Sequence, residues 1–190
     1  MAITTLNNRS INRSDTASAD QVWTATSATA SDFQAAAAGG KVLQVVSTTK
    51  SDTFSATSGS FADITGVSAS ITPAATSSKI LIFGTIYIGN TVGDVLTKIV
   101  RDSTDIGIGD ADGSRGRSTT AGSPRETYEL LSHPFNYLDS PSTTSSTTYK
   151  IQIYCGGSSQ TVYVNRSLND GDNAEGERTV STITLMEIGA

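Results

Sequence analysis

From Lys41 to the C-terminus, apolar and polar residues alternate in short runs that are separated by glycine, proline, serine, asparagine and aspartate. A two-residue period places successive side chains on opposite faces of a β-strand, and the residues between the runs are those that favour turns. The runs cover residues 42–48, 53–57, 61–67, 68–72, 79–88, 95–101, 126–132, 135–138, 149–155, 160–165 and 179–188. We therefore expect an antiparallel sandwich or barrel of about eight to ten strands.

Two connections between the runs have a recognisable chemistry. Ser58-Gly59-Ser60 lies between two runs and predicts a hairpin. Residues 103–123 are rich in glycine and aspartate and predict a long loop. No stretch keeps a helical period, and the best helical window, residues 31–38, is short and ends at two glycines. We expect a single helical turn there at most.

The composition fits this expectation. The chain has 190 residues, of which 36% are hydrophobic and only 16% charged, and serine and threonine are abundant. Threonine and valine favour extended backbone, and a domain of this length can bury enough surface to fold without a metal or a disulfide. The single cysteine, Cys155, alternates with Ile151 and Ile153 and is expected to be a small core residue.

Residues 1–40 differ from the rest of the chain. They are polar, rich in serine, threonine and asparagine, and have no sustained period. We expect an extended N-terminal arm over residues 1–40, followed by a β-rich head over residues 41–190. The arm has little to bury by itself, so its isolated large residues are expected to dock onto another protein. These anchoring candidates are Leu6, Ile11, Val22, Trp23 and Phe33.

The run over residues 79–88 is apolar on both faces. Four isoleucines face one way, and Leu81, Phe83 and Tyr87 face the other. A sandwich strand usually has one solvated face, so apolar residues on both faces indicate that both are covered. The second cover is either another element of the same chain or another subunit. By contrast, residues 149–155 alternate cleanly, which predicts one solvated face.

The charge pattern argues against two classes of partner. The formal net charge is −5, and the 13 basic residues are scattered along the chain. Binding to a nucleic-acid backbone requires clustered lysine or arginine, so no nucleic-acid partner is expected. No segment approaches the roughly 20 apolar residues of a membrane-spanning helix, and none has the pattern of a secretory leader. We therefore expect no membrane insertion.

Several fragments imitate catalytic motifs but depart from them. Gly39-Gly40-Lys41 ends like a phosphate-binding loop, yet Ala35 replaces its first glycine and Val42 its hydroxyl residue. No Gly-x-Ser-x-Gly elbow occurs. The only histidine, His133, precedes Pro134 and is expected at a strand boundary. The pair Glu126 and Glu129 is interpreted as a solvated edge. We expect no catalytic residue, no cofactor and no enzymatic activity.

The acidic loops are the natural surfaces for outward contact, because β-scaffolds carry recognition on loops. Clustered aspartates suit calcium, but neither the cluster at residues 102–112 nor the one at 170–175 has the spacing of a calcium loop. Turn chemistry is therefore preferred and no metal is expected. Arginines in the first loop supply donors for anionic surface sugars. The receptor-loop candidates are Asp110, Asp112, Arg115 and Arg117.

Several segments of the sequence together carry a resemblance to a known family. They are QVWTATSATASDFQ at residues 21–34, GGKVLQVV at 39–46, FADITG at 61–66, SITP at 70–73, SSKILI at 77–82, VRDST at 100–104, LDSP at 138–141 and ITLMEI at 183–188. In this order they resemble a junction and head found in tail-fibre and other virion appendage proteins of bacteriophages, mainly phages of marine bacteria. The resemblance covers nearly the whole chain.

The resemblance implies a virion structural protein, assembled in the host cytoplasm, with a jelly-roll head similar to the tumour-necrosis-factor fold. Such heads usually form homotrimers, so the outward residues Leu81, Phe83 and Tyr87 become candidates for the trimer interface. The arm would bind other tail or capsid proteins, and the head would bind a host surface glycan or protein.

About forty residues before the head leave no room for a fibre shaft. A short fibre or appendage for host attachment is therefore expected. A capsid decoration protein of the same fold is the alternative, and an enzyme acting on surface polysaccharide is a third hypothesis.

Overall fold

The computed structural model describes residues 21–25, 31–35, 40–57, 59–89, 93–156 and 160–189. The chain divides into two compact units, residues 1–39 and 40–190, and each is described by itself. Among the described residues, no helix is long and apolar enough to span a membrane.

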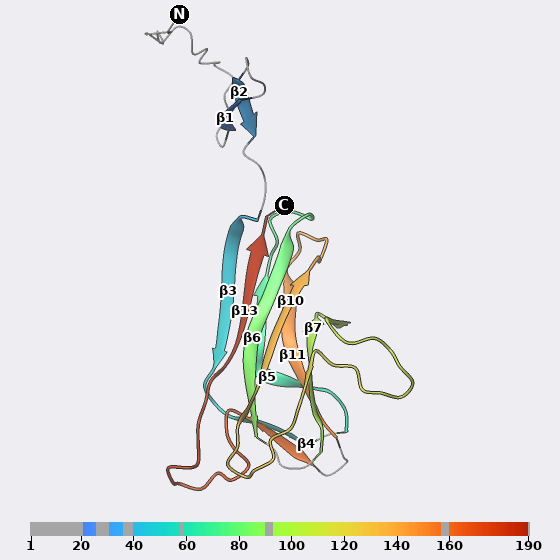
Figure 1. Cartoon of the computed structure of the whole chain (residues 1–190), viewed down its shortest axis with the longest axis vertical. Helices are drawn as coiled ribbons and strands as arrows, with labels where there is room; N and C mark the ends of the chain where they lie inside the picture. Colours follow the sequence, from blue (N-terminus) through green and yellow to red (C-terminus); the bar gives the residue numbers. More distant parts are fainter. Residues whose placement is uncertain are drawn as a thin grey trace, which may run out of the picture. The chain divides into compact units, whose positions relative to one another are not determined.

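The N-terminal unit contains a two-stranded antiparallel sheet. Strands β1 (Gln21–Ala25) and β2 (Ser31–Ala35) pair so that Trp23 lies opposite Phe33 in the register (Figure 1). The expected helical turn is therefore wrong over residues 31–35, because pairing with β1 satisfies the backbone of this segment as a strand. Of the anchoring candidates, Val22, Trp23 and Phe33 lie on these two strands, whereas Leu6 and Ile11 lie outside the described residues.

The first sheet of the head is built around the longest strand, β6 (Lys79–Gly89). One edge of β6 pairs with β13 (Ser181–Ile188), which in turn pairs with β3 (Val42–Lys50), and the other edge pairs with β10 (Leu131–Asp139). At the C-terminal end of β6 the sheet continues through β12 (Thr161–Val164) to β4 (Phe54–Thr57). All of these pairings are antiparallel, and β3, β13, β6 and β10 run along the length of the head (Figure 1).

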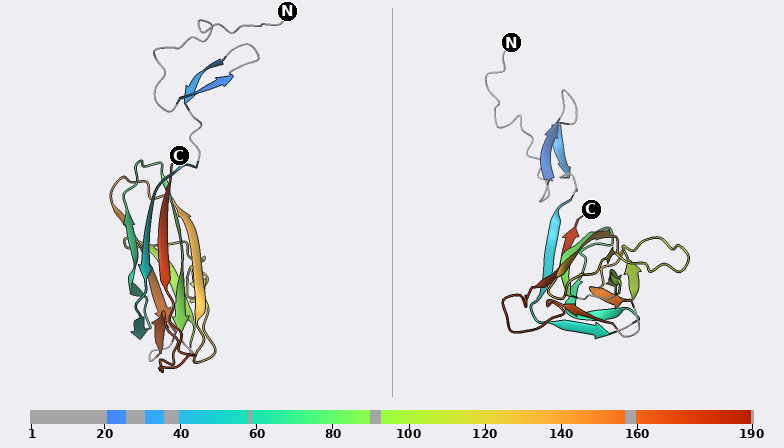
Figure 2. Two further views of the ribbon diagram at one scale, coloured as in Figure 1. Left: turned by 90° about the vertical axis from the view of Figure 1, so that its left-hand side faces the viewer. Right: turned by 60° about the horizontal axis from the view of Figure 1, so that its bottom comes forward.

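The second sheet contains β5 (Ala62–Ile71), β11 (Thr147–Cys155) and β7 (Val95–Arg101) side by side. Two short strands, β8 (Thr104–Ile106) and β9 (Thr120–Ala121), pair with β7. The two sheets form the layers of a sandwich, and further views of the head are shown in Figure 2.

The strand pairs are nested along the chain. β3 pairs with β13 and β6 with β10 in the first sheet, whereas β5 pairs with β11 and β7 with β8 and β9 in the second. The chain is thus arranged as one long hairpin whose arms pass back and forth between the sheets, which is the jelly-roll arrangement. The expectation of an all-β antiparallel sandwich is confirmed.

The core lies between the sheets and consists largely of β-branched residues. Strands β11 and β13 alternate strictly between buried and half-buried positions, as their two-residue period predicts. The fully buried aliphatic side chains, each at 0–1% exposure, include Ile80, Ile82, Ile86, Ile88, Ile99, Ile151, Ile153, Ile183 and Leu185. Burying each such side chain contributes about 1.5–3 kcal/mol, so the core supplies most of the driving force for folding.

The expected hairpin around residues 58–60 is wrong. β4 pairs with β12 in the first sheet, and β5 pairs with β11 in the second, so the connection crosses between the layers. Turn residues permit a hairpin but do not require one. Pairing with partners distant in sequence allows Phe54 and Ala56 to pack against the core.

Three further boundaries differ from expectation. β5 continues to Ile71, so residues 68–72 are not a separate strand. The weak runs 126–132 and 135–138 merge into β10, which begins at Leu131. Pro134 is tolerated there because β10 lies at the edge of the sheet. The long loop predicted for residues 103–123 contains the short strands β8 and β9.

Candidate functional site

Part of the outer face of the second sheet is polar, and several of its charges are paired. The Asp63 carboxylate accepts hydrogen bonds from Lys150 Nζ at 2.7 Å and from Gln152 Nε2 at 2.6 Å. The bond from Lys150, followed by that from Gln152, holds the pKa of Asp63 below its ordinary value despite partial burial. Lys98 Nζ lies 2.8 Å from Asp105 Oδ2. This part of the face has the chemistry of a surface that is in contact with water.

The outer face of the first sheet has the opposite chemistry. Val45, Met186, Leu81 and Leu138 lie directly opposite one another on four adjacent strands and therefore share one face. Val45 is 53% exposed and Leu138 is 48% exposed. Phe83 follows two residues after Leu81 and belongs to the same face. We call these five residues the apolar patch.

The exposed Lys79 lies two residues before Leu81 on β6, at the border of the patch, and the twelve outward positions that follow it along the sheet are uncharged. These positions are Val45, Ser47 and Thr49 on β3, Thr182, Thr184 and Met186 on β13, Leu81, Phe83 and Thr85 on β6, and Pro134, Asn136 and Leu138 on β10. A sheet face that is permanently in water normally contains charged side chains, which also discourage association. The central part of this face therefore has the low charge that is typical of the core of a protein interface.

The structure places the three sequence-predicted interface residues on this face. Leu81, Phe83 and Tyr87 all point away from the core and are half-buried. Leu81 and Phe83 belong to the apolar patch. Tyr87 lies further along β6, where it lines a hollow with the half-exposed Val180.

Sequence reasoning missed the other members of the patch. Val45, Leu138 and Met186 lie on strands far from β6 in the sequence, and only the pairing registers bring them beside Leu81.

The four receptor-loop candidates lie in the segment 107–119 that connects β8 and β9. The loop extends outward from the side of the sandwich (Figure 1). Arg115 Nη1 lies 2.7 Å from Asp112 Oδ2, and both side chains are exposed, at 74% and 73%. Arg117 Nε donates to the carbonyl of Gly109 at 2.6 Å. These two arginines thus brace the loop as well as lining its surface, and Asp110 is exposed beside them.

A pocket of about 680 Å³ lies beside this loop, over the outer face of the second sheet. Phe61, Leu96 and Tyr154 supply its apolar lining, and Asp94 and Arg115 are its charged residues. The rings of Phe61 and Tyr154 have centroids 5.5 Å apart and planes inclined by 39°. Only Arg115 was singled out from the sequence. The aromatic residues were missed because they are far apart in the sequence: Phe61 immediately precedes β5 and Tyr154 lies on β11.

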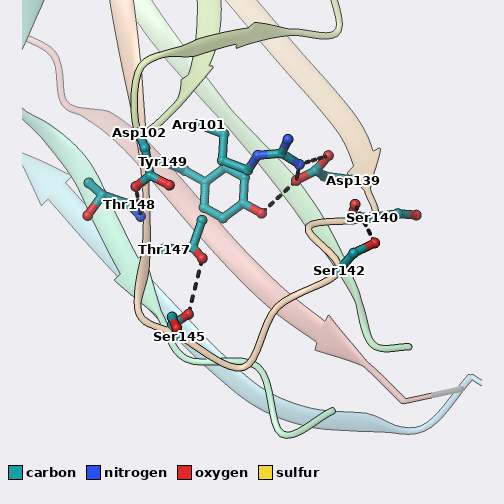
Figure 3. Close-up of polar contacts among 9 residues, drawn as sticks. All are labelled: Arg101, Asp102, Asp139, Ser140, Ser142, Ser145, Thr147, Thr148 and Tyr149. Carbon is teal, nitrogen blue, oxygen red and sulfur yellow. Dashed lines mark hydrogen bonds and ion pairs between the residues drawn. The ribbon is translucent and has the colours of Figure 1, made fainter. Parts of the chain in front are cut away.

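Asp139 is the centre of a buried polar group with a structural role (Figure 3). Arg101 Nη1 lies 2.9 Å and 2.8 Å from the two carboxylate oxygens of Asp139, and Tyr149 Oη donates to Asp139 Oδ2 at 2.7 Å. Burial and the bond to Asp139 raise the pKa of Tyr149, so its hydroxyl remains a donor. The same carboxylate raises the pKa of Arg101. These contacts join β10 of the first sheet to β7 and β11 of the second.

The residues that the sequence offers as catalytic candidates have structural roles in the fold. His133 is 1% exposed and lies within β10, opposite Ile86 on β6, so its expected place at a strand boundary is wrong. Glu129 accepts hydrogen bonds from the backbone N–H groups of Arg125 and Glu126 and so closes a turn. Cys155 is buried, as expected. Within the described ranges, no group of three or more histidine, cysteine, aspartate or glutamate side chains is arranged to hold a metal ion.

Comparison with known proteins gives a distant structural likeness. No family model and no curated protein matches the sequence. Among solved structures, the chain is similar to a chain in the structure of infectious bursal disease virus, Gt strain. The two are 15% identical with a TM-score of 0.40, and the match covers 87% of this chain and 43% of that chain. It is similar to a chain in the structure of the Gx strain, with 17% identity and a TM-score of 0.36, covering 87% of this chain and 44% of that chain. It is also similar to a chain in the crystal structure of the VP2 subviral particle of that virus, with 15% identity and a TM-score of 0.40, covering 87% of this chain and 43% of that chain.

The chain spans less than half the length of these viral chains. All three structures come from virus particles, and none is a phage tail fibre.

Proposed function

We propose that this chain is a non-catalytic structural protein of a virion, and that its head forms a homotrimer through the outer face of the first sheet. The observation that supports this proposal is the apolar patch at the centre of this face, with Lys79 as a charged residue only at its border. Contiguous exposed apolar surface on a soluble domain marks an interaction site, and charge is depleted at the centre of protein interfaces.

A second copy of the chain is the partner that fits this surface best. Because the patch is uncharged, identical patches meet without electrostatic repulsion. Hydroxyl and amide groups from Ser47, Thr184 and Asn136 lie in the same row as Phe83 and supply polar groups beside the apolar side chains. Three copies can close around one axis with the same face turned inward. The number three follows the resemblance of the sequence to trimeric phage heads.

The oligomeric state of the full chain tests this proposal. We expect the wild-type protein to sediment as a trimer. Leu138→Lys, at an exposed edge position, and Leu81→Lys, at the centre of the patch, should each weaken association by about a hundredfold or more, because a lysine would be buried without a partner. Thr65→Lys is the matched control, since Thr65 is exposed on β5 of the second sheet. A monomeric wild type, or a trimer that tolerates both patch variants, would contradict the proposal.

The N-terminal unit is the proposed attachment to the particle. Its candidates are Leu6 and Ile11, with Val22, Trp23 and Phe33 on β1 and β2. Deleting residues 1–38 should leave a trimeric head that no longer joins particles. A deletion variant that still assembles into virions would show that the anchor lies elsewhere.

Two roles on the particle are compatible with this arrangement. In the first, the protein decorates the capsid, and its two contact surfaces link neighbouring shell subunits. Particles that lack it should then break at lower temperature or lower salt while adsorbing normally to host cells.

In the second role, the protein is a short attachment appendage, which the pocket beside the 107–119 loop favours. Particles that lack it should then be stable but adsorb poorly. Labelling the protein in intact particles would locate it directly.

A further inference from the structure

We infer that the pocket beside the 107–119 loop binds a neutral saccharide residue. This inference deepens the attachment role of the proposed function. It rests on that role only for where the saccharide is found, namely on the host surface. The recognition chemistry itself belongs to a single head, because Phe61, Asp94, Leu96, Arg115 and Tyr154 all come from one chain.

The pocket has the size and the lining of a small-ligand site. Its volume of about 680 Å³ lies within the usual range for such sites, which are mostly apolar with a few polar groups that orient the ligand. The backbone of Gly116 packs closely on the pocket lining, because a Cβ at this position would lie 2.7 Å from Leu96 Cδ1. The loop therefore lies directly against the strand beneath it.

The apolar lining suits the C–H face of a pyranose ring. Phe61 and Tyr154 are half-buried and inclined to one another, and Leu96 lines the pocket with them. A sugar ring can cover such side chains with its C–H groups while its hydroxyls remain hydrogen-bonded at the rim. Aromatic pairs also bind cations, but here Lys98 Nζ already lies 4.1 Å from the centre of the Phe61 ring. A cationic ligand would be repelled by this ammonium group.

The charged residues of the lining favour a neutral ligand. Asp94 supplies acceptor oxygens, and no hydrogen bond or ion pair to its side chain is found among the described residues. Arg115 supplies donors and is partly neutralised by Asp112. One carboxylate and one guanidinium can bind sugar hydroxyls, which both donate and accept. The Asp94 carboxylate in the lining would repel an anionic sugar, so we propose a neutral saccharide in place of the anionic sugars expected from the sequence.

The backbone holds Asp94 in place at the pocket. Gly156 N–H donates to the Asp94 carbonyl at 2.7 Å and so connects the residues that precede β7 to those that follow β11.

In a trimer, three such pockets would act together, and linked sites can gain roughly 10²–10⁴ in apparent affinity. Weak binding by each pocket would therefore suffice for adhesion to a repetitive glycan surface.

Titration of the full chain with simple glycosides tests the inference. The probes are the methyl α- and β-pyranosides of glucose, galactose, mannose and N-acetylglucosamine, with methyl glucuronide and choline as the anionic and cationic comparators. Binding is followed by saturation-transfer NMR. The variants are Tyr154→Leu, Phe61→Leu and the conservative Asp94→Asn. Tyr163→Leu is the matched control, because Tyr163 is a half-buried tyrosine on β12 that is stacked with Arg166 at 3.8 Å.

We expect at least one neutral pyranoside to bind. Each pocket variant should weaken its binding by about tenfold or more, and the Tyr163 variant should leave it unchanged. Binding of none of the neutral probes, equal loss in the control, or tighter binding of the glucuronide or choline would overturn the inference. Sedimentation of the same samples separates the two proposals. A trimer that binds no glycoside refutes the saccharide site alone, and a monomer that binds one refutes the trimer alone.

Discussion

Asp139 connects the two sheets of the head through side-chain hydrogen bonds. It is 5% exposed, and it receives the Tyr149 hydroxyl from β11 and the Arg101 guanidinium from β7. A buried carboxylate is tolerated only when it is paired and hydrogen-bonded, and here both conditions are met. The arrangement therefore fixes how β10 sits over the second sheet.

Removing the Tyr149 hydroxyl tests this contact. We expect Tyr149→Phe to lower the free energy of unfolding by about 1–2 kcal/mol, because one hydrogen bond to a buried charged group is lost while the ring remains. Tyr154→Phe on the same strand is the control and should change stability by less than about 0.5 kcal/mol, since Tyr154 is half-exposed. Urea unfolding at one fixed protein concentration measures both variants. Equal stabilities for the two variants would show that the buried bond contributes nothing.

At the scale of elements, Gly84 permits β6 to lie between its two neighbours. A Cβ at this position would lie 2.1 Å from the Thr182 carbonyl oxygen on β13 and 2.7 Å from Cζ of Phe135 on β10. Both neighbours would have to move, and one of these contacts is backbone. The close approach of three strands therefore depends on the absence of a side chain in the middle of β6.

We expect Gly84→Ala to destabilise the head by about 1–3 kcal/mol through overpacking. Gly109→Ala is the matched control, because a Cβ there would meet nothing within 4 Å and its backbone does not require glycine. Thermal unfolding of the two variants measures the difference. A Gly84 variant as stable as the Gly109 variant would mean that the sheet adjusts without cost.

The elements also show which features could be predicted from sequence. Strand identity follows from a local two-residue period, and β7 has the predicted bounds, Val95–Arg101. Pairing depends on surfaces far apart in sequence, so β4 and β5 were wrongly predicted to form a hairpin. The same limit applies to the candidate sites. Leu81 and Arg115 could be identified, whereas Leu138 and Tyr154 acquire their role only through strand register.

At the scale of the whole molecule, acid should weaken the sandwich in two stages. The first stage belongs to His133, the only histidine of the chain. Burial lowers the pKa of His133, and the backbone of Gly122 offsets this only in part. Thr97 Oγ1 lies 3.3 Å from its Nδ1, and no hydrogen-bond partner for Nε2 is found among the described residues. The folded state thus favours the neutral ring.

The second stage belongs to carboxylates such as Glu187, which is fully buried. Burial by itself would raise the pKa of Glu187, but hydrogen bonds from Gln44 Nε2 at 2.6 Å and the Ala74 N–H at 2.7 Å outweigh it and lower the pKa. A lowered carboxyl pKa stabilises the fold above the ordinary glutamate pKa, and this contribution is lost as the pH falls through the folded value. This loss occurs below about pH 4.5.

Between about pH 7 and pH 5, the unfolded chain binds a proton at its histidine while the folded chain does not. The free energy of unfolding should therefore fall with acidification, by at most about 1.4 kcal/mol per pH unit for one proton. We expect His133→Gln to flatten this dependence, because glutamine does not titrate, and to leave the decline below about pH 4.5 in place. Urea unfolding at several pH values measures both slopes. A wild type and a variant with the same slope between pH 7 and pH 5 would mean that His133 is hydrated or already charged in the folded head, and that the sandwich is open at β10.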